Sequence, residues 1–130
     1  MKDLRLFIII IRNLSGYNTN IYYKSSTDGG INWGAAIQLT NKSSRSNFPS
    51  LCISGQVLNV VWEDNRDGNF EIYYKRSTDN GLNWEADRRM TNDTANSFLS
   101  SIAVSGQFLH MVLTDERNSN KEIYYKNSSD

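Results

Sequence analysis

Short apolar runs alternate along the chain with polar segments that contain turn-forming residues. Residues 49–54 (PSLCIS) alternate larger and smaller side chains, and residues 56–64 (QVLNVVWED) are rich in β-branched residues, both of which are typical of strands. Residues 70–77 (FEIYYKRS) and 82–90 (LNWEADRRM) form two further runs. Because polar residues and glycine separate the runs, the pattern predicts four short antiparallel strands.

The sequence repeats itself with a constant period. The tetrapeptide IYYK begins at Ile21, Ile72 and Ile123, so the spacing is 51 residues both times. A repeat of this length with four antiparallel strands is typical of one β-propeller blade. We therefore expect one all-β domain over residues 1–130 with a partial blade at 1–47, a full blade at 48–97 and a partial blade at 98–130, about 2.5 repeats in all. The first blade should lack its innermost strand, and the last its outermost.

An eight-residue motif, S-x-D-x-G-x-x-W, occurs at the same phase of the repeat. It comprises Ser26, Asp28, Gly30 and Trp33, then Ser77, Asp79, Gly81 and Trp84, and it begins again at Ser128 and Asp130. The motif resembles the Asp-box, or BNR repeat, of the sialidase-like β-propeller superfamily. An aspartate at a turn accepts hydrogen bonds from the backbone N–H groups that follow, and glycine tolerates a positive φ. We expect these residues to hold the turn between the third and fourth strands rather than to contact a ligand.

Three blades with incomplete ends would leave apolar blade faces uncovered. One hypothesis is that a second copy of the chain completes a closed ring, as a homodimer or larger assembly. The resemblance to the sialidase fold implies six blades for such a ring. The other hypothesis is that these residues are a piece of a longer propeller.

Composition narrows the range of partners and cofactors. The 14 Lys and Arg residues balance 14 Asp and Glu residues, so the chain lacks the positive charge expected of a nucleic-acid or polybasic membrane binder. Cys52 and His110 are single residues of their kind, which leaves too few ligands for a thiolate or multi-histidine metal site. We therefore expect no metal and no cofactor.

The apolar run from Leu6 to Ile11 is too short for a signal-peptide core or a membrane span, and we expect a buried strand there. No membrane partner is expected on these grounds. The resemblance implies an extracellular or cell-surface location, because many Asp-box proteins are found there, and the sequence itself does not identify the compartment.

One end of the predicted blades carries the loops between the second and third strands and the loops between blades. We call this end the loop face; its segments are residues 12–20, 40–48, 63–71, 91–97 and 114–122. The candidate ligand-binding residues are Asp64 and Arg66, their equivalents Asp115 and Arg117, and Trp62 or Tyr17 as stacking surfaces. Such side chains suit a neutral polyol such as a sugar. The alternative is that each Asp–Arg pair only orders its own loop.

No residue is assigned a catalytic role. Resemblance to a sialidase would imply an arginine triad, a Tyr–Glu nucleophile, an Asp acid/base and an Arg-Ile-Pro motif, and the sequence has no Arg-Ile-Pro. Asp64 and Asp115 occupy equivalent positions, so their surroundings should not separate their pKa values as acid and base roles require.

The leading hypothesis is a noncatalytic module that binds a glycan or another polar ligand through the loop face. One alternative is a fragment of a sialidase-like glycosidase whose catalytic residues lie largely outside this chain. Another alternative is a structural or protein-interaction module.

Overall fold

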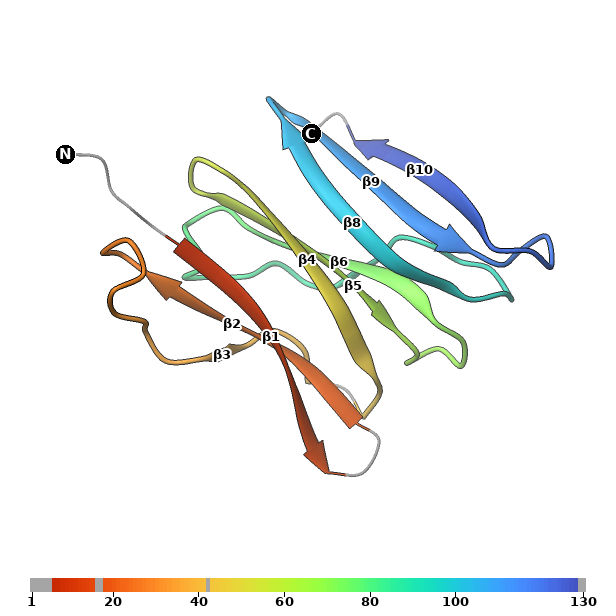
Figure 1. The fold of residues 1–130 in the computed structure, drawn as a ribbon, viewed down its shortest axis with the longest axis horizontal. Helices are drawn as coiled ribbons and strands as arrows, with labels where there is room; N and C mark the ends of the chain where they lie inside the picture. The colour runs from red at the N-terminus through yellow and green to blue at the C-terminus, as the bar shows by residue number, and fades with distance from the viewer. Residues whose placement is uncertain (1–5, 16–17, 42, 129–130) are drawn as a thin grey trace.

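A computed structural model describes residues 6–15, 18–41 and 43–128 of the chain. The strands are β1 (Leu6–Ser15), β2 (Asn18–Ser26), β3 (Ile37–Gln38), β4 (Ser46–Ser54), β5 (Val57–Asp64), β6 (Glu71–Ser77), β7 (Arg88–Arg89), β8 (Ser97–Ser105), β9 (Phe108–Asp115) and β10 (Glu122–Ser128). They form three antiparallel sheets with the orders β1-β2-β3, β4-β5-β6-β7 and β8-β9-β10. Figure 1 shows these sheets side by side in chain order.

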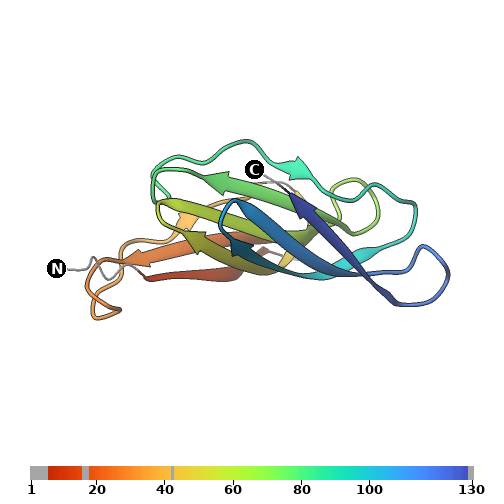
Figure 2. The same cartoon turned by 90° about the horizontal axis from the view of Figure 1, so that it is seen from above.

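The all-β prediction and the predicted strand order are confirmed. Within residues 6–15, 18–41 and 43–128, the first sheet has no innermost strand, the second has all four, and the third has no outermost strand, so the chain forms part of a propeller. The strands cross the long axis of the molecule obliquely (Figure 1), and the view from above shows β1 and β2 toward one end of the molecule and the loop between β9 and β10 at the other (Figure 2). Within the described ranges, no helix is long and apolar enough to cross a membrane.

The outermost strands are shorter than residues 82–90 had suggested. Strand β7 covers two residues, because the turn and an irregular segment take up the chain between Ser77 and Arg88. A single backbone hydrogen bond of 2.8 Å, from Glu85 N to the Arg76 carbonyl, ties that segment to β6. The outermost strand of the second sheet is therefore short and is extended only by separate backbone hydrogen bonds, such as that from Met90 N to the Ile72 carbonyl at 2.7 Å.

The innermost strands begin earlier than predicted and contain an irregularity. The register shifts between Asn47 and Ser50 in β4, and between the equivalent residues of β8. Phe48 and Leu99 lie within these shifts with φ values of 48° and 51°, which large side chains rarely adopt. Each bulge leaves its large apolar side chain exposed.

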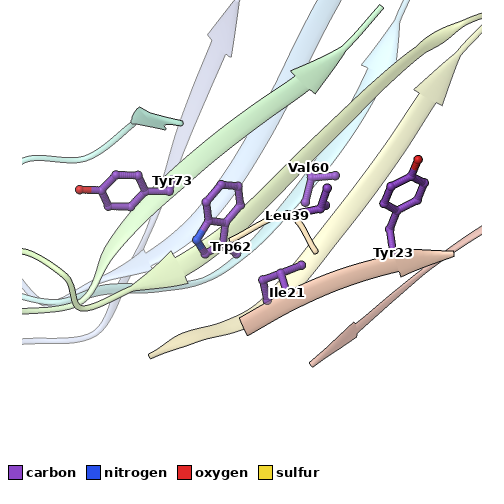
Figure 3. Packing of buried hydrophobic residues seen from close by; sticks show 6 residues of the cluster. All are labelled: Ile21, Tyr23, Leu39, Val60, Trp62 and Tyr73. Atoms are coloured by element: carbon purple, nitrogen blue, oxygen red, sulfur yellow. The ribbon is translucent and has the colours of Figure 1, made fainter. Parts of the chain in front are cut away.

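Among the residues whose side chains the structure describes, the core consists of two clusters, one at each seam between neighbouring sheets. At the first seam, Ile21, Tyr23 and Leu39 of the first sheet face Val60, Trp62 and Tyr73 of the second (Figure 3). At the second seam, Val61, Ile72 and Tyr74 face Ile102, Met111 and Leu113. Strand β5 therefore has both faces buried, which explains why its sequence is apolar at successive positions rather than at alternate ones.

The two seams use equivalent residues. Lys75 donates from Nζ to the Leu39 carbonyl at 2.6 Å, and Lys126, 51 residues later, donates to the Met90 carbonyl. The same offset of 51 residues relates Val61, Ile72 and Tyr74 to three residues on the far face of the third sheet. That set is Val112, Ile123 and Tyr125, with exposed fractions of 45%, 73% and 57%. We call it the open face.

Candidate functional site

The first S-x-D-x-G-x-x-W turn is closed by its own side chains. Ser26 Oγ donates to Asp28 Oδ1 at 2.8 Å and accepts from Gly30 N at 2.9 Å. Asp28 in turn accepts from the backbone N and from Nδ2 of Asn32, at 2.9 and 2.8 Å. These bonds hold the pKa of Asp28 at about 2, with the Asn32 backbone as the largest cause. Gly30 has a φ of 90°, which favours glycine.

The second turn repeats this geometry. Ser77 Oγ donates to Asp79 and accepts from Gly81 N, both at 2.8 Å, and Asp79 accepts from Asn83 N at 2.8 Å and from its Nδ2 at 2.7 Å. The asparagine before each tryptophan was not among the predicted residues. Because this asparagine occurs in both copies of the motif, the sequence could have identified it as part of the turn.

The two motif tryptophans have different surroundings. Trp33 donates to the Gly30 carbonyl at 3.1 Å and keeps 36% of its surface exposed. Trp84 packs on the first core cluster, edge to face with Tyr23 at 5.3 Å between ring centroids. Of the third motif, Ser128 ends β10 and Asp130 lies outside the described residues.

Asp64 is fully buried at the end of β5 and uses both carboxylate oxygens on protein groups. It accepts from Ser44 and Ser46 at 3.0 and 2.7 Å, from Trp62 Nε1 at 3.0 Å and from Arg66 Nη2 at 2.7 Å. Burial alone would raise its pKa, but Arg66 and the other donors outweigh burial and lower it. Arg66 also pairs with Asp87 at 2.8 Å.

Asp115 repeats the arrangement with fewer partners. It accepts from Ser97 Oγ at 2.8 Å and from Arg117 Nε and Nη2 at 2.9 and 2.7 Å. Arg117 holds the pKa of this carboxyl at about 2, and its guanidinium carbon lies 4.2 Å from the Tyr124 ring centroid. Both aspartates are therefore ionised in similar surroundings, and each joins its own loop to the preceding loop segment through a serine.

The expectation that Trp62 offers a stacking surface is wrong. Its side chain is completely buried and stacks on Tyr73 (Figure 3), with 6.2 Å between the ring centroids. Its N–H is bonded to Asp64. Sheets cover both faces of β5, so an aromatic residue on this strand lies in a seam rather than at the loop face. Tyr17, the other candidate, lies outside the described residues.

A polar hollow of about 640 Å³ lies where three loops of the loop face meet. It is lined by Asn69, Thr94, Ala95, Asn96, Glu116, Ser119, Asn120 and Lys121. Asn69 Nδ2 donates to the Ala95 carbonyl at 2.7 Å, which fixes one loop against the next. Asn96 Nδ2 lies 3.3 Å from Glu116 Oε2. The loops were predicted as ligand-face segments, whereas these individual lining residues were not singled out.

Glu63 is a second feature that sequence reasoning missed. It lies beside Asp64 on β5 but faces the third sheet, where its Oε2 accepts from Leu99 N at 3.0 Å. Burial raises the pKa of this carboxyl. The equivalent residue of the third sheet is Thr114, so Glu63 breaks the symmetry of the repeat.

Within the described part of the chain, no group of three or more His, Cys, Asp or Glu side chains could hold a metal ion.

No protein-family profile matches the chain, and no curated protein matches it. Among solved structures, an alpha-L-arabinanase from Penicillium chrysogenum in complex with arabinobiose matches with a TM-score of 0.72 and 17% identity, over 97% of this chain and 41% of its own. The chain thus spans less than half the length of that protein. NanB sialidase from Streptococcus pneumoniae, as a mutant, matches with a TM-score of 0.47 and 16% identity, over 92% of this chain and 21% of its own, which is too weak to support an argument. The stronger match and the strand order together show that the chain has the fold of part of a β-propeller.

Proposed function

We propose that this chain is a noncatalytic module of the Asp-box, sialidase-like propeller class, and that it binds a neutral glycan or a similar polar ligand through its loop face. The observation that carries the proposal is the hollow between the second and third sheets, whose lining is mostly uncharged and polar. The balanced net charge of the chain agrees with a neutral ligand.

The hollow offers both kinds of hydrogen-bonding group. Asn120 carries an amide donor and an amide acceptor, Glu116 is an acceptor, and Lys121 is a donor. Sugar hydroxyls both donate and accept, so a mixed lining suits them. The Lys121 ammonium lies 5.7 Å from the Phe98 ring centroid, which places an apolar surface beside the polar one. In this proposal the two Asp–Arg pairs serve the site by fixing the loops rather than by touching the ligand.

A glycan array probed with the purified chain tests the proposal. Asn120→Ala should weaken binding of any glycan that scores by about tenfold, the effect of one lost hydrogen-bonding side chain. Thr27→Ala is the matched control, because Thr27 is an exposed polar residue on the first S-x-D-x-G-x-x-W turn, away from the hollow. A folded chain that binds no glycan would refute the proposal and favour a structural or protein-interaction module.

We further propose that a second copy covers the open face, as a homodimer that completes the ring. The open face repeats the residues that the second sheet buries against the third, so a further blade would cover it in the same way. Light scattering should give twice the mass of the chain. Val112→Lys should yield the monomer, whereas a wild-type monomer that stays soluble at high concentration would contradict this part of the proposal.

A glycosidase fragment remains the second candidate, and Glu63 is the observation that favours it. Its raised pKa contrasts with the lowered pKa of Asp64, and a hydrolase needs such a difference between two carboxyl groups. Fluorogenic sialosides and arabinosides test this candidate directly. Turnover that Glu63→Gln abolishes in a folded protein would replace the noncatalytic assignment.

A further inference from the structure

The first seam shows how an S-x-D-x-G-x-x-W turn locks two sheets together. The turn belongs to the second sheet, yet its Trp84 packs on Tyr23 of the first, and the Tyr23 hydroxyl donates to the Gly81 carbonyl. The approach is close, because a Cβ on Gly81 would lie 2.6 Å from the Tyr23 hydroxyl oxygen. We call this arrangement the tyrosine seat, with Gly81 and Trp84 as its occupants.

The residue equivalent to Tyr23 at the second seam is Tyr74, and a cavity of about 490 Å³ lies beside it. Val61, Met90, Ile102, Leu109 and Met111 supply apolar lining, and Arg76, Arg88 and Lys126 supply positive charge. The Tyr74 hydroxyl donates to Asn59 Oδ1 at 2.6 Å rather than to a glycine carbonyl. The 130 residues contain two Gly-x-x-Trp segments, and neither is at this seat.

Residues beside the cavity are less buried than the equivalent residues beside the tyrosine seat of the first seam. Leu58 and Ser77, next to the occupied seat, have no exposed surface. Leu109 and Ser128, their equivalents, line the cavity and are half-buried. The turn that carries Gly81 and Trp84 covers the first pair, and no such turn covers the second pair in the described structure.

The backbone beside the cavity is also available for pairing. In the second sheet, Tyr73 and Tyr74 of β6 pair with the two residues of β7. The equivalent residues of β10, Tyr124 and Tyr125, have no outer strand beside them in the described structure. A segment that filled the cavity could therefore add to the edge of β10 as β7 adds to β6.

We propose that the cavity beside Tyr74 is a docking site for a polypeptide segment of the form Gly-x-x-Trp followed by a short strand. The tryptophan fills the apolar space over Tyr74, the glycine allows close approach of the backbone, and the strand extends the third sheet from β10. This occupant is argued from the first seam, where the same residue positions hold such a segment. It is independent of any ligand at the loop face.

A peptide of residues 79–91 of this chain is the probe, labelled with fluorescein and titrated with the full chain. Fluorescence anisotropy should show saturable binding that weakens by at least tenfold when the peptide carries Trp84→Ala, because the indole supplies most of the buried area. Leu109→Lys in the protein should weaken binding similarly, and Thr27→Ala should leave it unchanged. Equal binding of the two peptides would overturn the proposal, and if neither peptide binds, the extended chain described next decides.

A second experiment attaches the segment covalently to the chain, so that the result does not depend on the affinity of the free peptide. Residues 80–91 are appended after Asp130, which continues the third motif in register. The extended chain should melt several degrees higher than the parent, and the same extension with Trp84→Ala should lose most of that gain. An extension that leaves the melting temperature unchanged would overturn the proposal even if the peptide result were weak.

Discussion

Glu63 and Leu99 join two sheets: the buried carboxylate on β5 accepts a 3.0 Å hydrogen bond from the backbone N–H of the bulge residue on β8. The bond gives an otherwise strained left-handed residue a fixed partner. Because the carboxyl sits at a seam, its ionisation is linked to the packing of the second sheet on the third.

The stability of the chain should therefore depend on pH through Glu63. Burial raises its pKa in the folded state above the ordinary value of 4.5. The contribution of Glu63 is then fully present below the unfolded pKa, and it is lost as the pH rises through the folded pKa. Glu63→Gln keeps an acceptor for Leu99 but cannot ionise, so its advantage over the wild type should grow as the pH rises from 4. Urea unfolding of both proteins across this range measures the difference. A constant difference would show that Glu63 titrates normally.

The tyrosine seat should tolerate no side chain on Gly81. Gly81→Ala combines a φ of 84° with a Cβ placed against Tyr23, so it should cost about 2–4 kcal/mol of unfolding free energy. Gly55→Ala is the matched control, because Gly55 also has a positive φ but has open space around it, and it should cost about 1 kcal/mol. Adding Tyr23→Phe should recover part of the Gly81→Ala loss but none of the Gly55→Ala loss. Additive effects in this double-mutant cycle would argue against the contact.

Asp64 should contribute more to stability than Asp115. Asp64→Ala leaves Ser44, Ser46 and the Trp62 N–H without an acceptor and leaves Arg66 only partly paired, so the expected loss is about 3–5 kcal/mol. Asp115→Ala should cost less, because it strands fewer donors and water can reach the guanidinium that remains. Thermal and urea unfolding should rank the variants in this order, and equal losses would contradict it.

The turn aspartate Asp28 should titrate well below its ordinary range. NMR of the side-chain carboxyl carbons should find Asp28 titrating near pH 2, because Asn32 and Ser26 stabilise its ionised form. The pKa is depressed on folding, so this stabilisation is present above the ordinary value of 3.8 and is lost as the pH falls through about 2. Asn32→Ala should move the pKa of Asp28 back toward its ordinary value. No movement would show that the side-chain and backbone bonds of Asn32 do not control it.

Much of the fold could be predicted because the same 51-residue spacing occurs twice in the sequence. A fixed period set the strand order of all three sheets, and for β1 it agreed with the apolar run from Leu6 to Ile11. The shortness of the outer strands was not predictable from apolar runs. Trp84 looks like part of such a run, but its side chain packs on Tyr23 and its backbone is outside the paired strand β7. The bulges at Phe48 and Leu99 gave no signal either, since large residues rarely take a positive φ.

The site was predicted less well than the fold. Trp62 looked accessible to a ligand because the sequence does not show which strands have both faces covered by neighbouring sheets. Glu63 was overlooked because its partner is a backbone N–H, 36 residues away, that no motif reveals. The loops that form the hollow were predicted, since polar segments at equivalent phases of a repeat gather at one end of the blades.

The lysine bonds that recur at the two seams bear on how such chains change over generations. Lys75 bonds back to Leu39 and Lys126 bonds back to Met90, so the second unit carries one half of its joint with the first sheet and one half of its joint with the third. In-frame duplication or loss of one unit would consequently create a joint whose two halves already match. Recombination could thus alter blade number in a single event with this joint intact, although contacts found at one seam only, such as that of Glu63 with Leu99, would not be reproduced.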